Sequence, residues 1–271
     1  MECLVFNESD IVSKNSFKYF LSIKKEKSFE NYEIKHSEVK EAYKNDSLVV
    51  FNIKSDLTAA NYLDNFHFDC IYFISKHLSS SGVFTFTTHS LGNPSKNPSE
   101  INPFYLSKSS PKNMYSFIKE FYNTNKKLPI TYEATHHGPL LETPSLFLEY
   151  GGTTQSLENT EYSKILIDTL FSSIKTKHTP SKILLGIGSG HYPSKLTSLA
   201  IKKEYAFSHI LPYYVLNTLN LEELTLLLNN AYAASNDKFT NIIIEKKRLN
   251  KQIINNLLYL IEQKGLHYEL L

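Results

Sequence analysis

The chain has 271 residues, of which 41% are hydrophobic and 21% are charged, and this balance is ordinary for a folded globular protein. It excludes a fibrous or intrinsically disordered chain. The net charge at pH 7 is only +2, so an anionic partner has to be met by a local patch of positive charge rather than by the whole surface.

The cysteines and the first residues indicate the compartment. Cys3 and Cys70 form no CxxC pair and give no disulfide framework, as expected in a reducing cytosol. The start of the chain, MECLVFNESD, does not pair a basic segment with an apolar one, and no apolar run approaches the roughly 18 residues that a membrane helix needs. We therefore predict a cytoplasmic protein with no membrane partner.

Short apolar runs rich in β-branched residues predict strands, and segments with helical periodicity lie between them. In chain order, the pattern predicts a strand at 4–6, a helix at 13–25, strands at 47–53, 70–75 and 83–88, a loop at 92–103, a helix at 111–127, strands at 130–135 and 145–150, a helix at 160–175, a strand at 182–188, helices at 196–206 and 220–235, a strand at 240–245 and a helix at 250–265.

Strands that alternate with helices indicate an α/β fold. Several of the strand segments are continuously apolar, as in strands that are buried on both faces of a sheet. We expect a mixed, mostly parallel sheet flanked by helices. No linker is visible, so residues 1–271 are expected to form a single unit, with two closely packed lobes as the alternative.

Five of the ten histidines lie at or just beyond the end of a predicted strand. They are His77, His89, His136, His137 and His191. Ligands of open α/β sheets bind beyond the carboxyl ends of the strands, where loops from different strands converge. The competing interpretation is that strand ends are exposed and collect polar residues of any kind.

The segment TYEATHHGP (131–139) carries two adjacent histidines. On an extended strand the side chains of His136 and His137 would point to opposite faces, but a turn at Gly138 would let both enter one cleft. Glu133 shares a face with His137, and imidazole with carboxylate is the ligand set of catalytic zinc. The spacing fits no zinc consensus, so the pattern alone favours general acid–base chemistry, with metal binding as the minority interpretation. Glu149 is a further ligand, an acceptor that orients an imidazole, or a cap of the following turn.

GIGSGHYPSK (186–195) places three glycines after a predicted strand and before a predicted helix. The backbone of Gly186, Gly188 and Gly190 would allow close approach of a phosphate, although the full GxGxxG and GK[ST] patterns are absent. Tyr192 and Lys195, next to this turn, would suit a stacked base and a sugar–phosphate backbone.

Three stretches taken together resemble the archaeal and plant type of D-aminoacyl-tRNA deacylase: residues 75–94, 133–153 and 186–214, with the motifs THHGP and GHY. The resemblance implies hydrolysis of the ester between a D-amino acid and tRNA, and of glycyl-tRNA mischarged on tRNA-Ala, as a proofreading step in translation. It also implies zinc, at two ions per chain, and a fold related to phosphorylase-like and peptidyl-tRNA-hydrolase-like proteins.

On this basis we assign roles to the candidate residues. His136, His137 and Glu133 are predicted to surround the attacking water, the metal ligands are predicted to be His89, His137, His191 and Glu149, and substrate is expected at Gly186, Gly188, Gly190, Tyr192 and Lys195. The tRNA body would meet lysines in the segments 24–27, 126–127, 175–182, 202–203 and 246–251, and a monomer is expected. Two alternatives remain, a metal-independent nucleoside or phosphate-ester enzyme on the same scaffold and a non-catalytic RNA-binding module.

Overall fold

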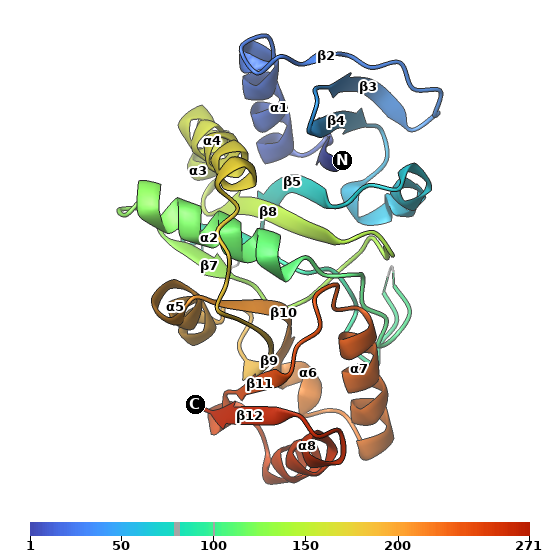
Figure 1. Cartoon of the computed structure of the whole chain (residues 1–271), viewed down its shortest axis with the longest axis vertical. Coiled ribbons are helices and arrows are strands. Elements are labelled where there is room, and N and C mark those ends of the chain that lie inside the picture. Colours follow the sequence, from blue (N-terminus) through green and yellow to red (C-terminus); the bar gives the residue numbers. More distant parts are fainter. Residues whose placement is uncertain (79–81, 100) are drawn as a thin grey trace.

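The computed structural model describes residues 1–78, 82–99 and 101–271 (Figure 1). Its larger sheet has eight strands in the order β2-β3-β4-β1-β5-β8-β6-β7. The bounds are β1 (Glu2–Phe6), β2 (Glu30–Asn31), β3 (Val39–Lys44), β4 (Leu48–Ile53), β5 (Ile71–His77), β6 (Thr85–His89), β7 (Ile130–Tyr132) and β8 (Ser145–Gly151). β4, β1, β5 and β8 are parallel, whereas β6 and β7 are parallel to each other and antiparallel to β8.

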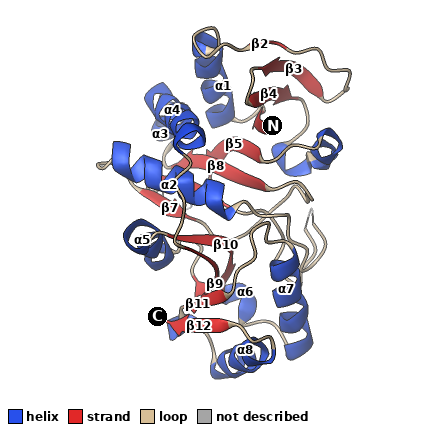
Figure 2. Ribbon diagram, viewed as in Figure 1, coloured by secondary structure: helices blue, strands red, loops and turns tan. Residues whose placement is uncertain are grey.

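A smaller, fully parallel sheet follows in the C-terminal half, with the order β10-β9-β11-β12 (Figure 2). Its strands are β9 (Lys182–Ser189), β10 (Tyr205–Pro212), β11 (Asn241–Ile244) and β12 (His267–Leu270). The predicted α/β class, with a mixed and mostly parallel sheet flanked by helices, is confirmed. The sequence did not reveal that the strands divide between two sheets. The relation to phosphorylase-like and peptidyl-tRNA-hydrolase-like folds stays a prediction.

The helices are α1 (Ile11–Ile23), α2 (Pro111–Thr124), α3 (Thr154–Glu158), α4 (Thr160–Thr176), α5 (Ser194–Lys203), α6 (Tyr213–Leu216), α7 (Leu221–Ala233) and α8 (Lys251–Gln263). Three short 3-10 helices are η1 (Leu57–Ala59), η2 (Asn61–Phe66) and η3 (Lys246–Arg248). The helices α1, α2 and α4 cover one face of the large sheet (Figure 1). Within the described ranges, no helix combines the length and the apolar character needed to cross a membrane.

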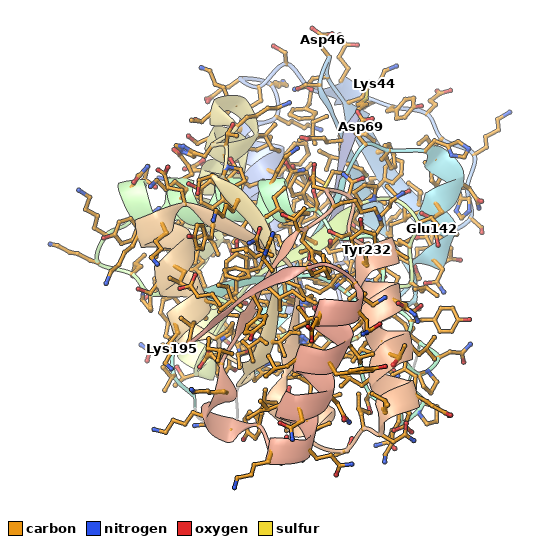
Figure 3. All side chains as sticks on the ribbon, turned by 60° about the horizontal axis from the view of Figure 1, so that its bottom comes forward. Lys44, Asp46, Asp69, Glu142, Lys195 and Tyr232 are labelled. Atoms are coloured by element: carbon orange, nitrogen blue, oxygen red, sulfur yellow. The ribbon has the colours of Figure 1, made fainter. Side chains whose placement is uncertain are left out.

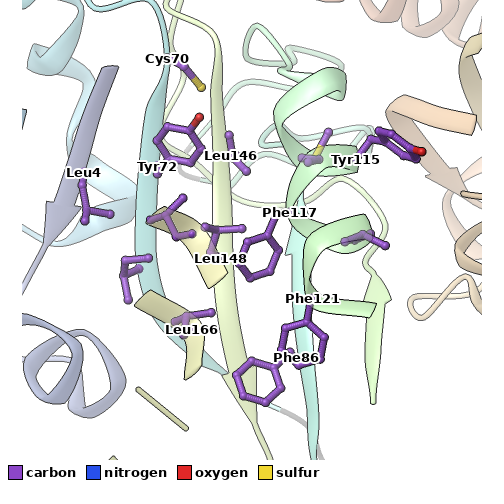
Figure 4. Close-up of a cluster of buried hydrophobic side chains, with 14 of the residues drawn as sticks. Leu4, Cys70, Tyr72, Phe86, Tyr115, Phe117, Phe121, Leu146, Leu148 and Leu166 are labelled. Carbon is purple, nitrogen blue, oxygen red and sulfur yellow. The ribbon is translucent and has the colours of Figure 1, made fainter. Parts of the chain in front are cut away.

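Alternation along each strand distributes the core over both faces of the large sheet. In β1, Leu4 and Phe6 face the helices, whereas Cys3 and Val5 face η1 and η2 on the other side. Figure 4 shows the helix-covered face, where Phe117 of α2 meets Leu148 of β8. Burying a side chain of this size contributes about 1.5–3 kcal/mol, so both faces are strongly stabilised.

The hydrophobic cluster beneath α2 continues into the smaller sheet. It contains Leu184 of β9, Phe207 of β10 and Ile243 of β11 together with the core of the large sheet. A second cluster fills the other face of the small sheet, under α7 and α8. One continuous cluster across both sheets is consistent with a single unit over residues 1–271. The single unit itself stays a prediction.

Several predicted boundaries change in the structure, and the reasons are local. The strand predicted at 130–135 ends at Tyr132: the Glu133 amide still donates to Thr88 of β6, but the amides of Ala134 and Thr135 donate to His191 and Ile210 of the C-terminal half. The helix predicted at 196–206 ends at Lys203, and β10 follows almost at once. The predicted loop 92–103 is a loop in which the Asn93 amide donates to the carbonyls of Asn97 and Ile101. Residue 100 of that loop lies outside the described residues.

Candidate active site

The five strand-end histidines come together, although not at one carboxyl edge of a sheet. His77 ends β5 and pairs with Gly151 of β8, while His89 ends β6 and pairs with Phe147 of the same strand. Because β5 and β6 flank β8 and run in opposite directions, the two histidines approach Glu149 from opposite ends of β8. All of these side chains lie on the sheet face opposite α1, α2 and α4.

The segment after β7 joins the two sheets and carries the adjacent histidines. The Ala134 amide donates to the carbonyl of His191, and the Thr135 amide donates to that of Ile210, both at 2.9 Å. His137 has φ 38°, in the left-handed region that L-residues rarely adopt. This conformation brings the His136 and His137 rings to 4.4 Å between centroids, so the turn that the sequence required is present.

The loop after β9 closes the site from the smaller sheet. His191 Nε2 lies 2.9 Å from Glu133 Oε2, and the Tyr192 hydroxyl forms a hydrogen bond with His77 Nε2. The Tyr214 hydroxyl lies 3.4 Å from His191 Nδ1. The site is therefore built jointly by the two sheets, and it requires the contact between them.

Three of the imidazoles form a first group of potential metal ligands. His89, His136 and His137 each place one ring nitrogen within 4.8 Å of the others. The Nδ1 atoms of these rings face backbone carbonyls of Ser90, Ala134 and Gly138 at 2.8–3.2 Å. A proton held on Nδ1 by a carbonyl leaves the Nε2 lone pair free, which is the tautomer that binds metal ions.

His77, Glu133 and His191 form a second group, with the same spacing of ligand atoms. Glu149 lies between the two groups. Its Oε2 is 3.6 Å from His77 Nδ1 and its Oε1 is 3.8 Å from His89 Nε2, while the Ser75 hydroxyl donates to Oε1. A carboxylate in this position could serve either group or both.

The polar atoms converge here without satisfying one another. Neither oxygen of Glu133 accepts a hydrogen bond of normal geometry from any described residue, although His77 Nδ1 and His191 Nε2 lie 3.1 and 2.9 Å away. Nε2 of the fully buried His89 has no hydrogen-bond partner either in this part of the chain. Unsatisfied buried lone pairs cost free energy, and a cation at their meeting point would satisfy them. The residues present therefore fit a bound metal ion.

The two carboxylates remain ionised in spite of their burial. Burial alone would raise the pKa of Glu133, but the close approach of His191 and His77 outweighs it and lowers that pKa well below 4.5. Burial would also raise the pKa of Glu149, and interactions with His77 and His89 lower it to about 2. Both groups are available as anionic ligands at neutral pH.

The imidazoles of the site differ in the direction in which their pKa values are shifted. Burial lowers the pKa of His136 well below 6.5, and it also lowers the pKa of His137, so both rings are neutral at physiological pH. Burial also disfavours the charged form of His77, but Glu133 and Glu149 outweigh burial and raise the pKa of His77 to about 11. Neutral imidazole is the form that binds a metal ion or accepts a proton from water, so a metal ion bound at His77 would displace the proton that the two carboxylates otherwise hold there.

Two pockets lie on either side of the loop 190–192. The larger, of about 490 Å³, is open to His77, His136, His137, Glu149 and His191. Its remaining wall comes from the segment before α1, which ends at the cap residue Asp10, and from η1 with its cap residue Asp56, together with Lys76, Leu78 and Phe147. The smaller pocket, of about 290 Å³, is lined by Gly188, Gly190, Tyr192, Ser194, Lys195, Glu245, Lys247 and Arg248.

The glycines of the predicted phosphate turn have different surroundings. Gly186 lies inside β9, where a Cβ atom would stand 2.6 Å from Leu196 of α5, and it lines neither pocket. Gly188 has φ 82° and a Cβ there would meet the Glu245 carbonyl at 2.5 Å. A Cβ on Gly190 would make only an ordinary contact, with Arg248 Nη1 at 3.7 Å. Gly186 and Gly188 therefore allow close packing of the chain, whereas Gly190 lines the smaller pocket.

Some residues of the site have no role in the assignment made from the sequence. His77 was noted only as a strand-end histidine, yet it contacts both carboxylates of the site. Ser75 and Tyr214 were not singled out, and each contacts a site residue. The signal for His77 was present, because it ends the run ISKH as His89 ends TFTTH. Ser75 and Tyr214 carry no signal in the sequence.

The fold and the site define an α/β protein with a buried histidine–carboxylate centre of the kind that metal-assisted hydrolases use. A family model described as D-aminoacyl-tRNA deacylase matches residues 64–269. A D-aminoacyl-tRNA deacylase of Archaeoglobus fulgidus is 27% identical over 267 residues, 94% of this chain and 92% of the relative. The enzyme of the same name from Pyrococcus furiosus is 31% identical over 203 residues, 70% of this chain and 75% of the relative. The chain belongs to the D-aminoacyl-tRNA deacylase family.

A solved structure gives independent support for the fold. The crystal structure of a conserved protein of unknown function superimposes with a TM-score of 0.85, over 100% of this chain and 95% of that one. The two sequences are 24% identical, so the likeness concerns the fold alone.

Proposed function

We propose that the protein hydrolyses the ester bond between a D-amino acid and tRNA and releases both. The observation that carries this proposal is that the family match over residues 64–269 contains the whole histidine–carboxylate centre, from His77 to His191. Family membership disfavours both alternatives, a metal-independent nucleoside or phosphate-ester enzyme and a non-catalytic RNA-binding module. The reaction class is ester hydrolysis.

An aminoacyl ester is already activated, so the enzyme has to supply a positioned water, a base and a group that stabilises the oxyanion. The aminoacyl group would occupy the pocket of about 490 Å³, with its carbonyl carbon facing His136 and His137. Their Nε2 atoms are free to accept a proton, and burial keeps both rings neutral. Glu133 would orient the water together with them.

Zinc is the proposed cofactor, at two ions per chain. His89, His136 and His137 would hold one ion, while His77, Glu133 and His191 would hold the other, with Glu149 within reach of both. Bound Zn²⁺ would lower the pKa of a coordinated water and polarise the ester carbonyl. His136 and His137 cannot be metal ligand and proton acceptor through the same Nε2 atom, so metal removal decides between these two roles.

Chirality would be read by exclusion. A pocket that fits the D-side chain forces the L-side chain into the wall whenever the carbonyl faces the centre. Glycine has no side chain to exclude, so glycyl-tRNA should also be cleaved. The test is deacylation of matched D-tyrosyl-tRNA and L-tyrosyl-tRNA. We expect a much higher rate on the D-isomer, and equal rates would overturn the proofreading assignment.

The tRNA body requires positive charge, which the lysines in the segments 24–27, 126–127, 175–182, 202–203 and 246–251 would provide. A cytoplasmic location follows from the substrate. The monomeric state remains a prediction that sedimentation or light scattering can check.

A further inference from the structure

The smaller pocket contains the only arginine of the chain. Of the 29 cationic Lys and Arg residues, 28 are lysines and one is Arg248. Arginine and lysine are not interchangeable at a site that has to bind two oxygens at once. The property that lysine lacks is the planar fork of N–H donors, which binds two oxygens of a phosphate at once. Arg248 is therefore suited to bind an anion such as a phosphate.

The guanidinium of Arg248 is held in place but left without an anion. Its Cζ lies 5.1 Å from the centroid of the Tyr213 ring, a cation–π contact that limits its freedom. Its Nη1 would be 3.7 Å from a Cβ placed on Gly190, so the guanidinium lies beside the loop that carries His191. In the described part of the chain, neither Arg248 nor Lys247 forms an ion pair.

The pocket around Arg248 is positively charged. Lys195, Lys247 and Arg248 line it together with one carboxylate, Glu245, whose Oε2 lies 3.6 Å from Lys195 Nζ. The charges come from two separate elements, the first turn of α5 and the 3-10 helix η3 after β11. Figure 3 labels Lys195 on a view that brings the end of the molecule carrying α8 forward. Three cations and one anion leave a net attraction for a phosphate.

The position of the pocket relates it to the proposed ester. Tyr192 lines the pocket with its ring while its hydroxyl contacts His77 Nε2 in the centre, and Gly190 directly precedes His191. The pocket and the centre are thus separated by one loop. In an aminoacyl-tRNA, one ribose separates the ester oxygen from the phosphodiester on the 5′ side of the terminal nucleotide.

We propose that the pocket formed by Arg248, Lys247 and Lys195 binds this 5′ phosphodiester of the terminal nucleotide, with Arg248 donating to both non-bridging oxygens. The proposal rests on the proposed function and names the part of its substrate that this pocket recognises. The lysines attract the phosphate, the arginine fixes its orientation, and the ester is thereby directed across Tyr192 to the centre.

The test uses three D-tyrosyl esters: that of adenosine, which has no phosphate, that of CpA, which has one phosphodiester, and that of tRNA. For the wild type we expect a higher kcat/KM on D-tyrosyl-CpA than on D-tyrosyl-adenosine. Arg248→Gln should reduce this preference by about 10–100-fold, the scale of losing charge-assisted hydrogen bonds. Arg248→Lys keeps the charge but not the fork, and it should still lose about fivefold or more.

The matched control is Lys18→Gln, which removes the same charge from an exposed position on α1. It should leave the preference unchanged. Equal rates of wild type on the adenosine and CpA esters, or an unchanged preference in Arg248→Gln, would overturn the subsite while leaving the deacylase proposal intact. An effect of Arg248→Gln that is confined to whole tRNA would also overturn it, because a more distant phosphate would then be the ligand.

A binding measurement separates failure of the subsite from failure of the proposed function. By calorimetry, 5′-AMP should bind the wild-type protein more tightly than adenosine does, and Arg248→Gln should abolish the difference. This readout needs no turnover. If no D-tyrosyl ester is cleaved but the AMP preference depends on Arg248, the phosphate subsite stands and the deacylase proposal falls. Circular dichroism and a melting curve accompany each variant to verify folding.

Discussion

Glutamate and histidine side chains meet on both faces of the large sheet, and the two places differ in whether the carboxylate oxygens have hydrogen-bond partners. On the helix-covered face, Glu120 of α2 accepts a hydrogen bond from Ser172 of α4 at 2.6 Å and meets His178 Nε2 at 2.7 Å. On the other face, the oxygens of Glu133 lie near His77 and His191 but accept no well-aligned hydrogen bond from any described residue.

The difference separates a structural pair from a candidate ligand site. Each oxygen of the Glu120 carboxylate has a hydrogen-bond partner, so this group stabilises the contact between α2 and α4. At Glu133, ring nitrogens converge while the carboxylate oxygens and His89 Nε2 have no hydrogen-bond partner among the described residues, which costs stability unless another group fills the space. A glutamate close to a histidine therefore does not by itself indicate a ligand site. A buried glutamate that lies close to histidines but lacks hydrogen-bond partners does.

The largest expected effect follows from removing the ligand. Prolonged chelation should lower deacylation of D-tyrosyl-tRNA by about 10³-fold or more, since a metal ion contributes several kcal/mol to such a transition state. Metal analysis should find about two zinc ions per chain before treatment, as the two ligand groups predict, and added Zn²⁺ should restore the rate. A demetallated protein that keeps its full rate would return the histidines to acid–base or positioning roles.

The next effect concerns single histidines of the first group. His136→Ala and His137→Ala should each lower the single-turnover rate by about 100-fold or more, because each removes a ligand or a proton acceptor. The affinity for tRNA should stay nearly unchanged. The control is His267→Ala, which alters an exposed histidine on β12 and should have no effect on the rate. Wild-type rates in both site variants would move the chemistry to His191 and the loop that carries it.

The sequence predicted the fold where burial dominates. Continuous apolar runs such as LVVF in β4 and IYFI in β5 are typical of strands buried on both faces, and both are found in such strands. β10 was missed because YAFSHILP follows α5 directly and interrupts its apolar run with Ser208 and His209. β2, β3 and β12 are partly or fully exposed and have little hydrophobic pattern to detect.

For the site, the sequence predicted the participants better than their arrangement. Strand-end position identified the histidines, but it could not show that β6 runs antiparallel to β8, which is what places Glu149 between His77 and His89. Pairing direction depends on tertiary contacts that no single segment encodes. Arg248 received no role from the sequence, although it is visibly the one arginine of the chain. It lies about 60 residues after the GHY motif, and only folding brings η3 beside loop 190–192.

A smaller effect should separate surface charge from the chemistry of the centre. Lys202 and Lys203 end α5, and Lys203 Nζ lies 3.8 Å from Glu269 Oε1 and 5.9 Å from the centroid of the Tyr205 ring. Replacing both lysines with glutamine should weaken tRNA binding and flatten the slope of log K against log salt by about 2, as expected for two lost phosphate contacts. The rate on D-tyrosyl-adenosine should not change. An unaltered salt slope would show that these lysines are solvated and do not touch tRNA.

The smallest expected effect concerns Glu120, the carboxylate whose hydrogen-bond partners give it a structural role. Burial would raise its pKa, but the hydrogen bonds from Ser172 and His178 outweigh burial and lower it below 4.5 in the folded state. A carboxylate whose pKa is depressed by folding stabilises the protein above its unfolded pKa, and this contribution is lost as the pH falls through the folded pKa. Glu120→Gln should therefore lower the free energy of unfolding by about 1 kcal/mol at pH 6.

The difference between wild type and Glu120→Gln should shrink as the pH is lowered toward 3, because the wild-type carboxyl then becomes neutral like the amide. Urea titrations at several pH values between 3 and 6 measure it, and taking the difference cancels the titration of Glu133 and Glu149, which both proteins share. Glu262→Gln, at an exposed position on α8, should show no such pH dependence. Deacylation by the folded Glu120→Gln variant should match wild type. A loss of rate without a loss of stability would mean that Glu120 also influences the centre through the sheet, and the distinction between satisfied and unsatisfied pairs would fail.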